Sequence, residues 1–457
     1  LTESNLDANG VLAGESKKTL RGTIDFVHGC KGSTGNERET VLLADKNVVN
    51  KTVPVILCDE DDVMGNHGAT IGHVRPEQHF YLSCRGLSDK AIESLFAVAA
   101  LEEAHMAFKD DRIKRGIAQL ALAKGIDAND FDDLAFLDSA ATAQRPNCVL
   151  EAQRSFYETM NANALRGLYR LSVEATEAIN EARSTVASFI GATQSQDVVF
   201  CRNTSEALNI VAKSFGPSVL EPGDEVCITI MEHHSNLIPW QQVCRATGAT
   251  LVYLRPDDQG IITPQEMDRK INERTKIVSA THVSNVLGIE NPVAELGKRV
   301  HAVGGYLVVD GAQSVPHIPV DIRQIDCDFF AFSGHKVFGP FGIGVLWGRH
   351  ELLDSMPPFL TGGEMIDSVS ETDAVWAPVP EKFEAGTQDA AGIYATAKAL
   401  DYVNALGMRT LQEREILLME YLMDRMRELP FIEIIGHKDA SKHHGALSFN
   451  VKGIHPH

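Results

Sequence analysis

From Leu137 onward, short apolar runs alternate with stretches of helical periodicity, and this alternation restricts the fold more than any other feature. Ser172–Ile190 has the spacing of an amphipathic helix, with Gly191 just past its end. The expected strands are Val198–Phe200, Glu225–Thr229, Thr250–Tyr253, Ile277–Ser279, Tyr306–Val309 and Phe329–Phe332. Strands apolar on both faces, with helices between them, predict an α/β fold whose mainly parallel sheet is covered by helices.

The beginning of the chain has a different pattern. Residues 1–86 carry short β-like runs, such as Thr23–Val27, separated by Gly, Asn and Asp turns, and they show no helical period. From Ser88 to about Lys124, apolar residues recur at helical spacing, and we expect helices there. The first segment is therefore expected to be mainly β, followed by helices.

An acidic stretch near residues 126–134 predicts a boundary between two domains, which we expect over 1–126 and 132–457. The second domain ends in a mostly helical segment. We expect a strand at Phe431–Ile435 and no closing element before His457. Because the first residue is Leu1 and not Met, the amino end has the appearance of an interior point of a longer chain.

Composition limits the partners of this chain. The net charge of −20 repels phosphate backbones, so we expect no nucleic-acid partner. No apolar run approaches the ~18–20 residues that span a bilayer, so we expect no membrane segment. The eight cysteines have neither the spacing of a zinc site nor that of a redox dithiol, which favours a reduced, cytoplasmic protein.

Four features of the second domain point to one site. Asp310 stands at the carboxyl end of an apolar run, where side chains of parallel sheets face the ligand crevice. Lys336 follows another apolar strand, and His233 follows a third. Thr204 and Ser205 open a helix, where hydroxyls and free backbone amides can hold an anion such as phosphate.

Together these residue types match the needs of pyridoxal 5'-phosphate (PLP). A lysine amine can bond to its aldehyde, and an acid can keep the pyridine nitrogen protonated so that the ring accepts electrons. A flat side chain can stack on the ring, and a helix start can hold the phosphate. Taken alone, Asp310 could be a turn residue and Lys336 a solvated one, whereas their joint occurrence in this order favours a site.

These residues also carry a family resemblance. Residues from about 132 to 457 resemble a class V aminotransferase-fold enzyme, specifically a SufS-type cysteine desulfurase, which implies PLP fold type I. The matching segments are Leu137–Thr142, Asn203–Asn209, Met231–Asn236, Thr281–Asn285, Val309–Gln313, Ser333–Lys336, Gly362–Ile366 and Phe383–Thr387.

The resemblance implies a role for each residue around the cofactor ring. Lys336 would hold the cofactor, and Asp310 would pair with the ring nitrogen. Gln313 would donate to the ring oxygen, with Asn285 near that oxygen and the substrate carboxylate. His233 would stack on the ring and shuttle a proton, so Lys336 and His233 are the expected catalytic residues.

The resemblance also implies how the phosphate is held. The expected residues are Thr204, Ser205, Ser333 and His335, with Thr387 reaching the phosphate across the interface of a homodimer. The implied reaction converts L-cysteine to L-alanine and leaves the sulfur as an enzyme persulfide. That step needs a cysteine thiolate.

The sequence departs from the family in two places. The family usually has His-Arg-Gly-x-His-x-Leu-Ser where this chain has Leu165–Ser172, so both histidines are replaced. The family's persulfide-forming cysteine and its carboxylate-binding arginine lie downstream of the segment that matches Gly453–His457. We therefore expect residues 1–457 alone to bind PLP without completing sulfur transfer.

Segments within about residues 15–108 resemble the carboxyl-terminal part of SufD, a scaffold subunit of iron–sulfur cluster assembly. They are Leu20–Phe26, Gly65–Gly72 and Phe80–Ser88. The resemblance implies the end of a β-helix followed by helices. It aligns His67 with a histidine thought to serve cluster assembly, which makes His67 a weak candidate iron ligand beside its reading as a turn histidine.

The leading hypothesis is a cysteine desulfurase joined to an iron–sulfur scaffold segment, with L-cysteine, scaffold proteins and sulfur-acceptor proteins as partners. Such a fusion would raise the effective concentration of sulfur source and acceptor. One alternative keeps the fold and changes the substrate, as in a selenocysteine lyase or another class V lyase. A second alternative is an inert docking protein, and a third is that the join comes from a misread sequence.

Overall fold

The computed structural model describes residues 2–12, 14–43, 47–84, 89, 92, 95–97, 99, 136–165 and 167–454. The chain divides into two compact units, Leu1–Ala135 and Phe136–His457. The predicted boundary near 126–134 and most of the predicted helical stretch from Ser88 to Lys124 lie outside the described residues. No helix within the described ranges combines the length and apolarity needed to cross a membrane.

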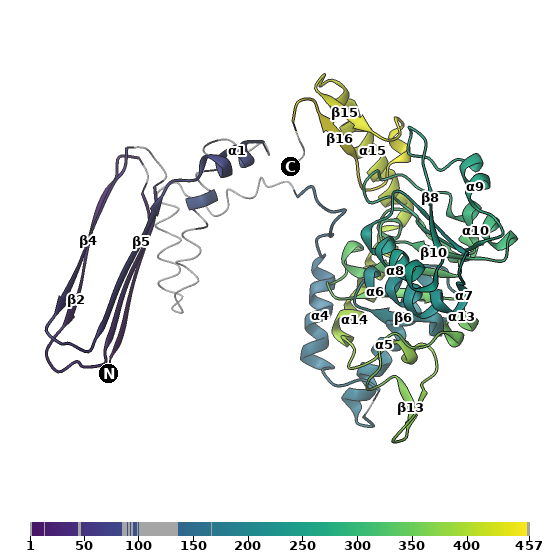
Figure 1. The fold of residues 1–457 in the computed structure, drawn as a ribbon, viewed down its shortest axis with the longest axis horizontal. Coiled ribbons are helices and arrows are strands. Elements are labelled where there is room, and N and C mark those ends of the chain that lie inside the picture. Colours follow the sequence, from purple (N-terminus) through teal and green to yellow (C-terminus); the bar gives the residue numbers. More distant parts are fainter. Residues whose placement is uncertain are drawn as a thin grey trace. The chain divides into compact units, whose positions relative to one another are not determined.

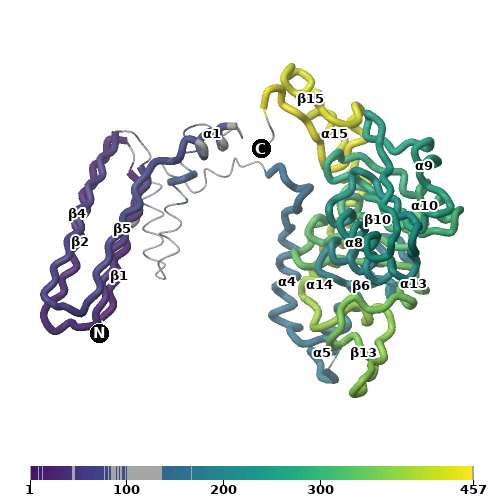
Figure 2. Tube along the Cα trace, in the orientation of Figure 1, coloured from purple at the N-terminus to yellow at the C-terminus, as the bar shows by residue number. Residues whose placement is uncertain are grey.

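The first unit is a coil of parallel strands. Glu3 lies opposite Thr34, and Thr34 lies opposite Met64, so that corresponding residues recur about every thirty positions. The strands are β1 (Glu3–Leu12), β3 (Thr34–Leu43) and β5 (Met64–Gly72) on one side, and β2 (Lys17–Phe26) and β4 (Val49–Cys58) on the other. Figure 2 shows β1 and β5 running along the same side. This arrangement is that of a β-helix end.

Stacked polar side chains mark each turn of this coil. The Asn36 side-chain amide donates to Asn5 Oδ1 over 2.8 Å, and the Asn66 side-chain amide donates to Asn36 Oδ1 over 3.0 Å.

The expectation that residues 1–86 have no helical period was wrong, because they also contain helix α1 (Pro76–Cys84). Pro76 starts this helix, where the missing N–H of proline costs nothing.

The second unit is built on a seven-stranded sheet in the order β6-β12-β11-β10-β9-β7-β8. Its strands are β6 (Val198–Cys201), β7 (Glu225–Thr229), β8 (Thr250–Leu254), β9 (Thr275–Thr281), β10 (Tyr306–Asp310), β11 (Phe329–Ser333) and β12 (Gly344–Gly348). All six predicted strands are present. The sequence did not identify β12, a short strand with glycine at both ends, which pairs antiparallel with β6 and β11.

Helices cover both faces of this sheet, as predicted (Figure 1). Along β6, Val198 and Phe200 join one buried apolar cluster, and Val199 joins the other. The helices are α4 (Asn147–Thr159), α5 (Arg170–Phe189), α6 (Thr204–Ile210), α7 (Gly216–Val219), α8 (Ile238–Thr247), α9 (Pro264–Lys270), α10 (Val293–Ala302), α11 (Ser314–His317), α12 (Ile322–Ile325), α13 (His350–Ser355), α14 (Ala390–Leu406) and α15 (Met408–Arg427). The fold class is therefore the α/β class expected for PLP fold type I.

Two small hairpins complete the described part of this unit. β13 (Ile366–Val369) pairs with β14 (Ala374–Trp376). β15 (Ile432–Ile435) pairs antiparallel with β16 (Ser448–Val451), so the expectation that no element closes this region before His457 was wrong. The missed strand is short and only partly buried, so its sequence carries little periodic signal.

Candidate active site

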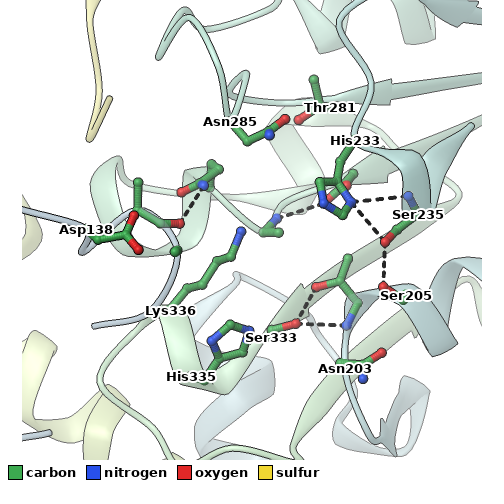
Figure 3. A pocket seen from close by; sticks show the side chains of 16 residues that line it. Asp138, Asn203, Ser205, His233, Ser235, Thr281, Asn285, Ser333, His335 and Lys336 are labelled. Atoms are coloured by element: carbon green, nitrogen blue, oxygen red, sulfur yellow. Dashed lines mark hydrogen bonds between the residues drawn. The ribbon is translucent and has the colours of Figure 1, made fainter. Parts of the chain in front are cut away.

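The parallel strands β9, β10 and β11 end at the same edge of the sheet, and a cavity of about 490 Å³ lies there. Nine of the ten residues expected to form the site line it: Thr204, Ser205, His233, Asn285, Asp310, Gln313, Ser333, His335 and Lys336. Figure 3 shows the Lys336 side chain extending into this space, with His233 and Asp138 on either side. The cavity thus gathers residues that are far apart in the sequence.

Asp310 and Lys336 form the charged centre of the cavity. Asp310 ends β10, is only 3% exposed, and its Oδ1 accepts a hydrogen bond of 2.9 Å from the Ala312 amide. Burial raises the pKa of the Asp310 carboxyl, while this hydrogen bond and the Lys336 cation oppose the rise. Burial lowers the pKa of the Lys336 amine, and Asp310 opposes that change. Lys336 therefore reaches its nucleophilic neutral form more easily than a solvated lysine.

One end of the cavity presents hydroxyls and backbone amides at the start of α6. The side chain of Asn203 caps this helix by accepting from the Glu206 amide over 3.0 Å. Ser333 Oγ accepts from the Thr204 amide at 2.8 Å and lies 2.6 Å from Thr204 Oγ1. These bonds connect the end of β11 to the start of α6. The hydroxyls of Thr204, Ser205 and Ser333 form a set of donors suited to phosphate.

His233 lies on the loop after β7 and is held by its neighbour Ser235. The Ser235 amide donates to His233 Nδ1 over 3.2 Å, and Ser235 Oγ lies 2.9 Å from the same nitrogen. Ser235 Oγ in turn contacts Ser205 Oγ (Figure 3). Because a backbone N–H can only donate, Nδ1 of the neutral ring is unprotonated and the proton lies on Nε2. Burial also lowers the pKa of His233, which favours this neutral form.

Gln313 and His335 are anchored at the rim by the segment before α4. Gln313 Nε2 donates to the Ala140 carbonyl over 2.8 Å. The backbone carbonyl of His335 accepts from the Ala143 amide over 3.0 Å, and the ring nitrogen Nδ1 of His335 lies 3.2 Å from Thr142 Oγ1. Burial lowers the pKa of His335, so that its ring is mainly neutral at physiological pH.

Thr387, the tenth expected residue, does not line this cavity. It is exposed and lines a separate cavity of about 370 Å³ with Arg202. His67 belongs to the other unit, where it is exposed on β5 and lies opposite Glu37 in the parallel register. Within the described ranges, no group of three or more His, Cys, Asp or Glu side chains is arranged to hold a metal ion.

Several residues of the cavity were not identified from the sequence as site residues. They are Asp138, Ala140, Ala141, Asn203, Ser235, Thr281 and Ala312. All seven lie inside the segments that resemble the family, but their side chains are small or common in turns. Thr281 could have been found, because it ends β9 beside the strand that carries Asp310.

Two family descriptions match the chain. "Aminotransferase class-V" matches residues 135–457. "SUF system FeS cluster assembly, SufBD core domain" matches residues 1–100.

Known proteins resemble the second unit closely. A "Cysteine desulfurase" of Haloferax volcanii is 47% identical over 330 residues, which cover 72% of this chain and 77% of that protein. A "Probable cysteine desulfurase" of Halalkalibacterium halodurans is 45% identical, covering 71% and 79%. The solved apo structure of cysteine desulfurase from Thermococcus onnurineus NA1 has a TM-score of 0.69 and 39% identity, and the match covers 71% of this chain and 80% of that one.

Proposed function

Because this chain belongs to the class-V aminotransferase family, we propose that it is a PLP-dependent cysteine desulfurase that converts L-cysteine to L-alanine and supplies the sulfur for iron–sulfur cluster assembly. The single observation that carries this proposal is the placement of the Lys336 amine and the buried Asp310 carboxylate in one cavity with a hydroxyl-lined helix start. Relatives at 42–47% identity named cysteine desulfurase support the substrate.

The residues of the cavity fit PLP in number and chemistry. Lys336 would hold the cofactor through its amine, and Asp310 would pair with the ring nitrogen. Gln313 and Asn285 would lie toward the ring oxygen. Thr204, Ser205, Ser333 and His335 would hold the phosphate, for which neutral histidine and hydroxyl side chains are suitable partners. When bound, PLP supplies an aldehyde that bonds to amines and a ring that accepts electrons.

The chain's own groups would handle the proton transfers. With its pKa lowered by burial, Lys336 Nζ is suited to take the proton from the α-carbon of L-cysteine. Neutral His233 carries its proton on Nε2, and that proton can be donated to a developing anion beside it. Asp310, shielded from water, would keep its negative charge next to the ring nitrogen once that nitrogen is protonated.

The sulfur is then taken up by a thiolate, and the described cysteines are poorly suited to that step. None of them is among the residues that line the cavity. Burial raises the pKa of Cys227 to about 12 and that of Cys244 to about 11, which keeps both as thiols.

The proposal extends to the setting of the reaction. The amino-terminal match to the SufBD core domain favours a role in iron–sulfur cluster assembly, with scaffold and sulfur-acceptor proteins as partners. A covalent link between the two units would keep sulfur source and acceptor at high effective concentration. We further propose a SufS-type homodimer in the cytoplasm, in which the exposed Thr387 reaches the phosphate site of the partner subunit.

Trapping the cofactor tests the proposal directly. Purified protein is loaded with PLP, reduced with borohydride and digested, and mass spectrometry identifies the labelled peptide. We expect the label on Lys336 and its loss in Lys336→Ala, whereas Lys276→Ala, at a half-buried lysine of β9, keeps it. No label, or a label on another lysine, would overturn the proposal.

A further inference from the structure

Glu232 lies next to the cavity without lining it. It follows β7 by three residues, directly precedes His233, and is half-buried behind the loop that carries that histidine. The cavity wall contains His233, Ser235 and Thr281 but not Glu232. Contact between this side chain and the cavity is therefore made through neighbouring residues.

Three donors, two at strand ends and one in the turn after β7, converge on the Glu232 carboxyl group. Oε1 accepts from Thr229 Oγ1 at 2.6 Å and from the Thr281 amide at 2.9 Å. Oε2 accepts from Asn236 Nδ2 at 2.6 Å. Thr229 ends β7 and Thr281 ends β9, its parallel neighbour. One side chain thus joins two strand ends to the loop between them.

The direction of these hydrogen bonds is determined by the residues behind them. Asn236 is fully buried, and its Oδ1 accepts from Trp240 Nε1 at 3.0 Å and from Ser279 Oγ at 2.6 Å. Since the indole N–H can only donate, the amide nitrogen of Asn236 must face Glu232. The Thr281 backbone N–H is likewise a donor only. Two of the three partners therefore require an acceptor at position 232.

We propose that Glu232 is a positioning residue of the active site, which holds His233 in place over the cofactor ring by anchoring its loop to the ends of β7 and β9. This inference rests on the proposed function, because it assumes PLP in the cavity. Burial raises the pKa of Glu232 to about 8, and its two oxygens accept from all three donors at once. A glutamine would turn its own NH₂ group toward at least one of them, and that donor would lose its partner.

The test measures PLP binding by Glu232→Gln through two readouts other than activity. The apparent dissociation constant for PLP comes from an absorbance titration, and visible circular dichroism reports the orientation of the bound ring. Leaving one buried donor without its partner is expected to raise the dissociation constant about tenfold, and the dichroism should change in amplitude. Glu266→Gln is the matched control, because Glu266 is also half-buried and accepts from a backbone amide, that of Arg255, away from the cavity.

A double-mutant cycle separates positioning from general destabilisation. If Glu232 acts through His233, then Glu232→Gln made in a His233→Ala background should weaken PLP binding less than about threefold. A tenfold effect in both backgrounds would overturn the inference. If Glu232→Gln does not fold, Thr229→Val removes one donor to Glu232 together with the acceptor of the Met231 amide, and it should weaken PLP binding about threefold. An unchanged affinity would overturn the inference.

The outcomes also distinguish this inference from the proposed function. Failure of the wild-type protein to bind PLP contradicts the proposed function itself. Normal binding by the wild type, with unchanged affinity and dichroism in Glu232→Gln, contradicts only the role of Glu232.

Discussion

A buried ion pair holds the segment that leads to Thr387, and breaking it should have a large effect. Arg183 on α5 bonds both oxygens of Glu384, over 2.7 Å and 2.9 Å, and both side chains are almost fully buried. Arg183 also donates to the Val198 carbonyl, and Glu384 accepts from the Phe200 amide. The pair therefore joins α5, β6 and the loop before α14.

The substitution Glu384→Ala removes two of the three hydrogen-bond acceptors just named for the Arg183 guanidinium, and the Val198 carbonyl is the third. It also removes the acceptor of the Phe200 amide. Removing one partner of a buried pair costs about 3–5 kcal/mol, and the lost backbone bond adds about 1 kcal/mol. We expect the free energy of unfolding of the second unit to fall by about 4 kcal/mol or more.

Urea unfolding followed by tryptophan fluorescence measures this effect in the intact chain. All three tryptophans, Trp240, Trp347 and Trp376, belong to the second unit, so the signal does not depend on the first unit. The matched control is Glu158→Ala, which removes an exposed partner of Arg154 and should change stability by less than about 0.5 kcal/mol.

A second variant checks the physical reason. Replacing both partners, as Arg183→Met with Glu384→Leu, removes the uncompensated charge and should be at least about 2 kcal/mol more stable than Glu384→Ala. The reasoning is refuted if Glu384→Ala unfolds within about 1 kcal/mol of the wild type, or if the double variant is no more stable than the single one.

Two further predictions concern the cavity. A Cβ at Gly344 would lie 2.4 Å from Asn203 Cα, so Gly344→Ala must displace the start of α6. This variant should destabilise the second unit by about 1–3 kcal/mol and weaken PLP binding. Gly362→Ala is the control and should have neither effect, because nothing lies within 4 Å of a Cβ at Gly362. Equal PLP affinity in the two variants would contradict this account. Burial lowers the pKa of Lys336, so between that lowered value and pH ~10.5 the folded state binds fewer protons than the unfolded state, and stability should rise with pH in that window. Between about pH 8 and pH 10, the free energy of unfolding of the cofactor-free wild type should increase with pH, whereas that of Lys336→Met should not. An increase of the same size in both proteins would show that it does not come from Lys336.

The residues expected at the site show what sequence reasoning can reach. Asp310, Lys336 and His233 were identified because each lies at or shortly beyond the end of an apolar run, and the ends of parallel strands meet at one edge. The network behind the cavity was not identified. Glu232 belongs to a matching segment, but its three partners are known only once β7, β9 and the turn at Asn236 are packed together.

The layered α/β architecture could be predicted from the sequence, because the pattern of apolar residues along a strand records which of its faces are buried. Val198 and Val199 are both apolar, and each enters a different core on its own side of the sheet. Three features are visible only in the packed molecule: β12 runs antiparallel, Thr387 faces a separate cavity, and Ser333 bonds the Thr204 amide. The pattern of apolar residues in a segment predicts only which faces of that same segment are buried. Contacts between residues 129 positions apart, such as Thr204 and Ser333, depend on how all the segments pack at once.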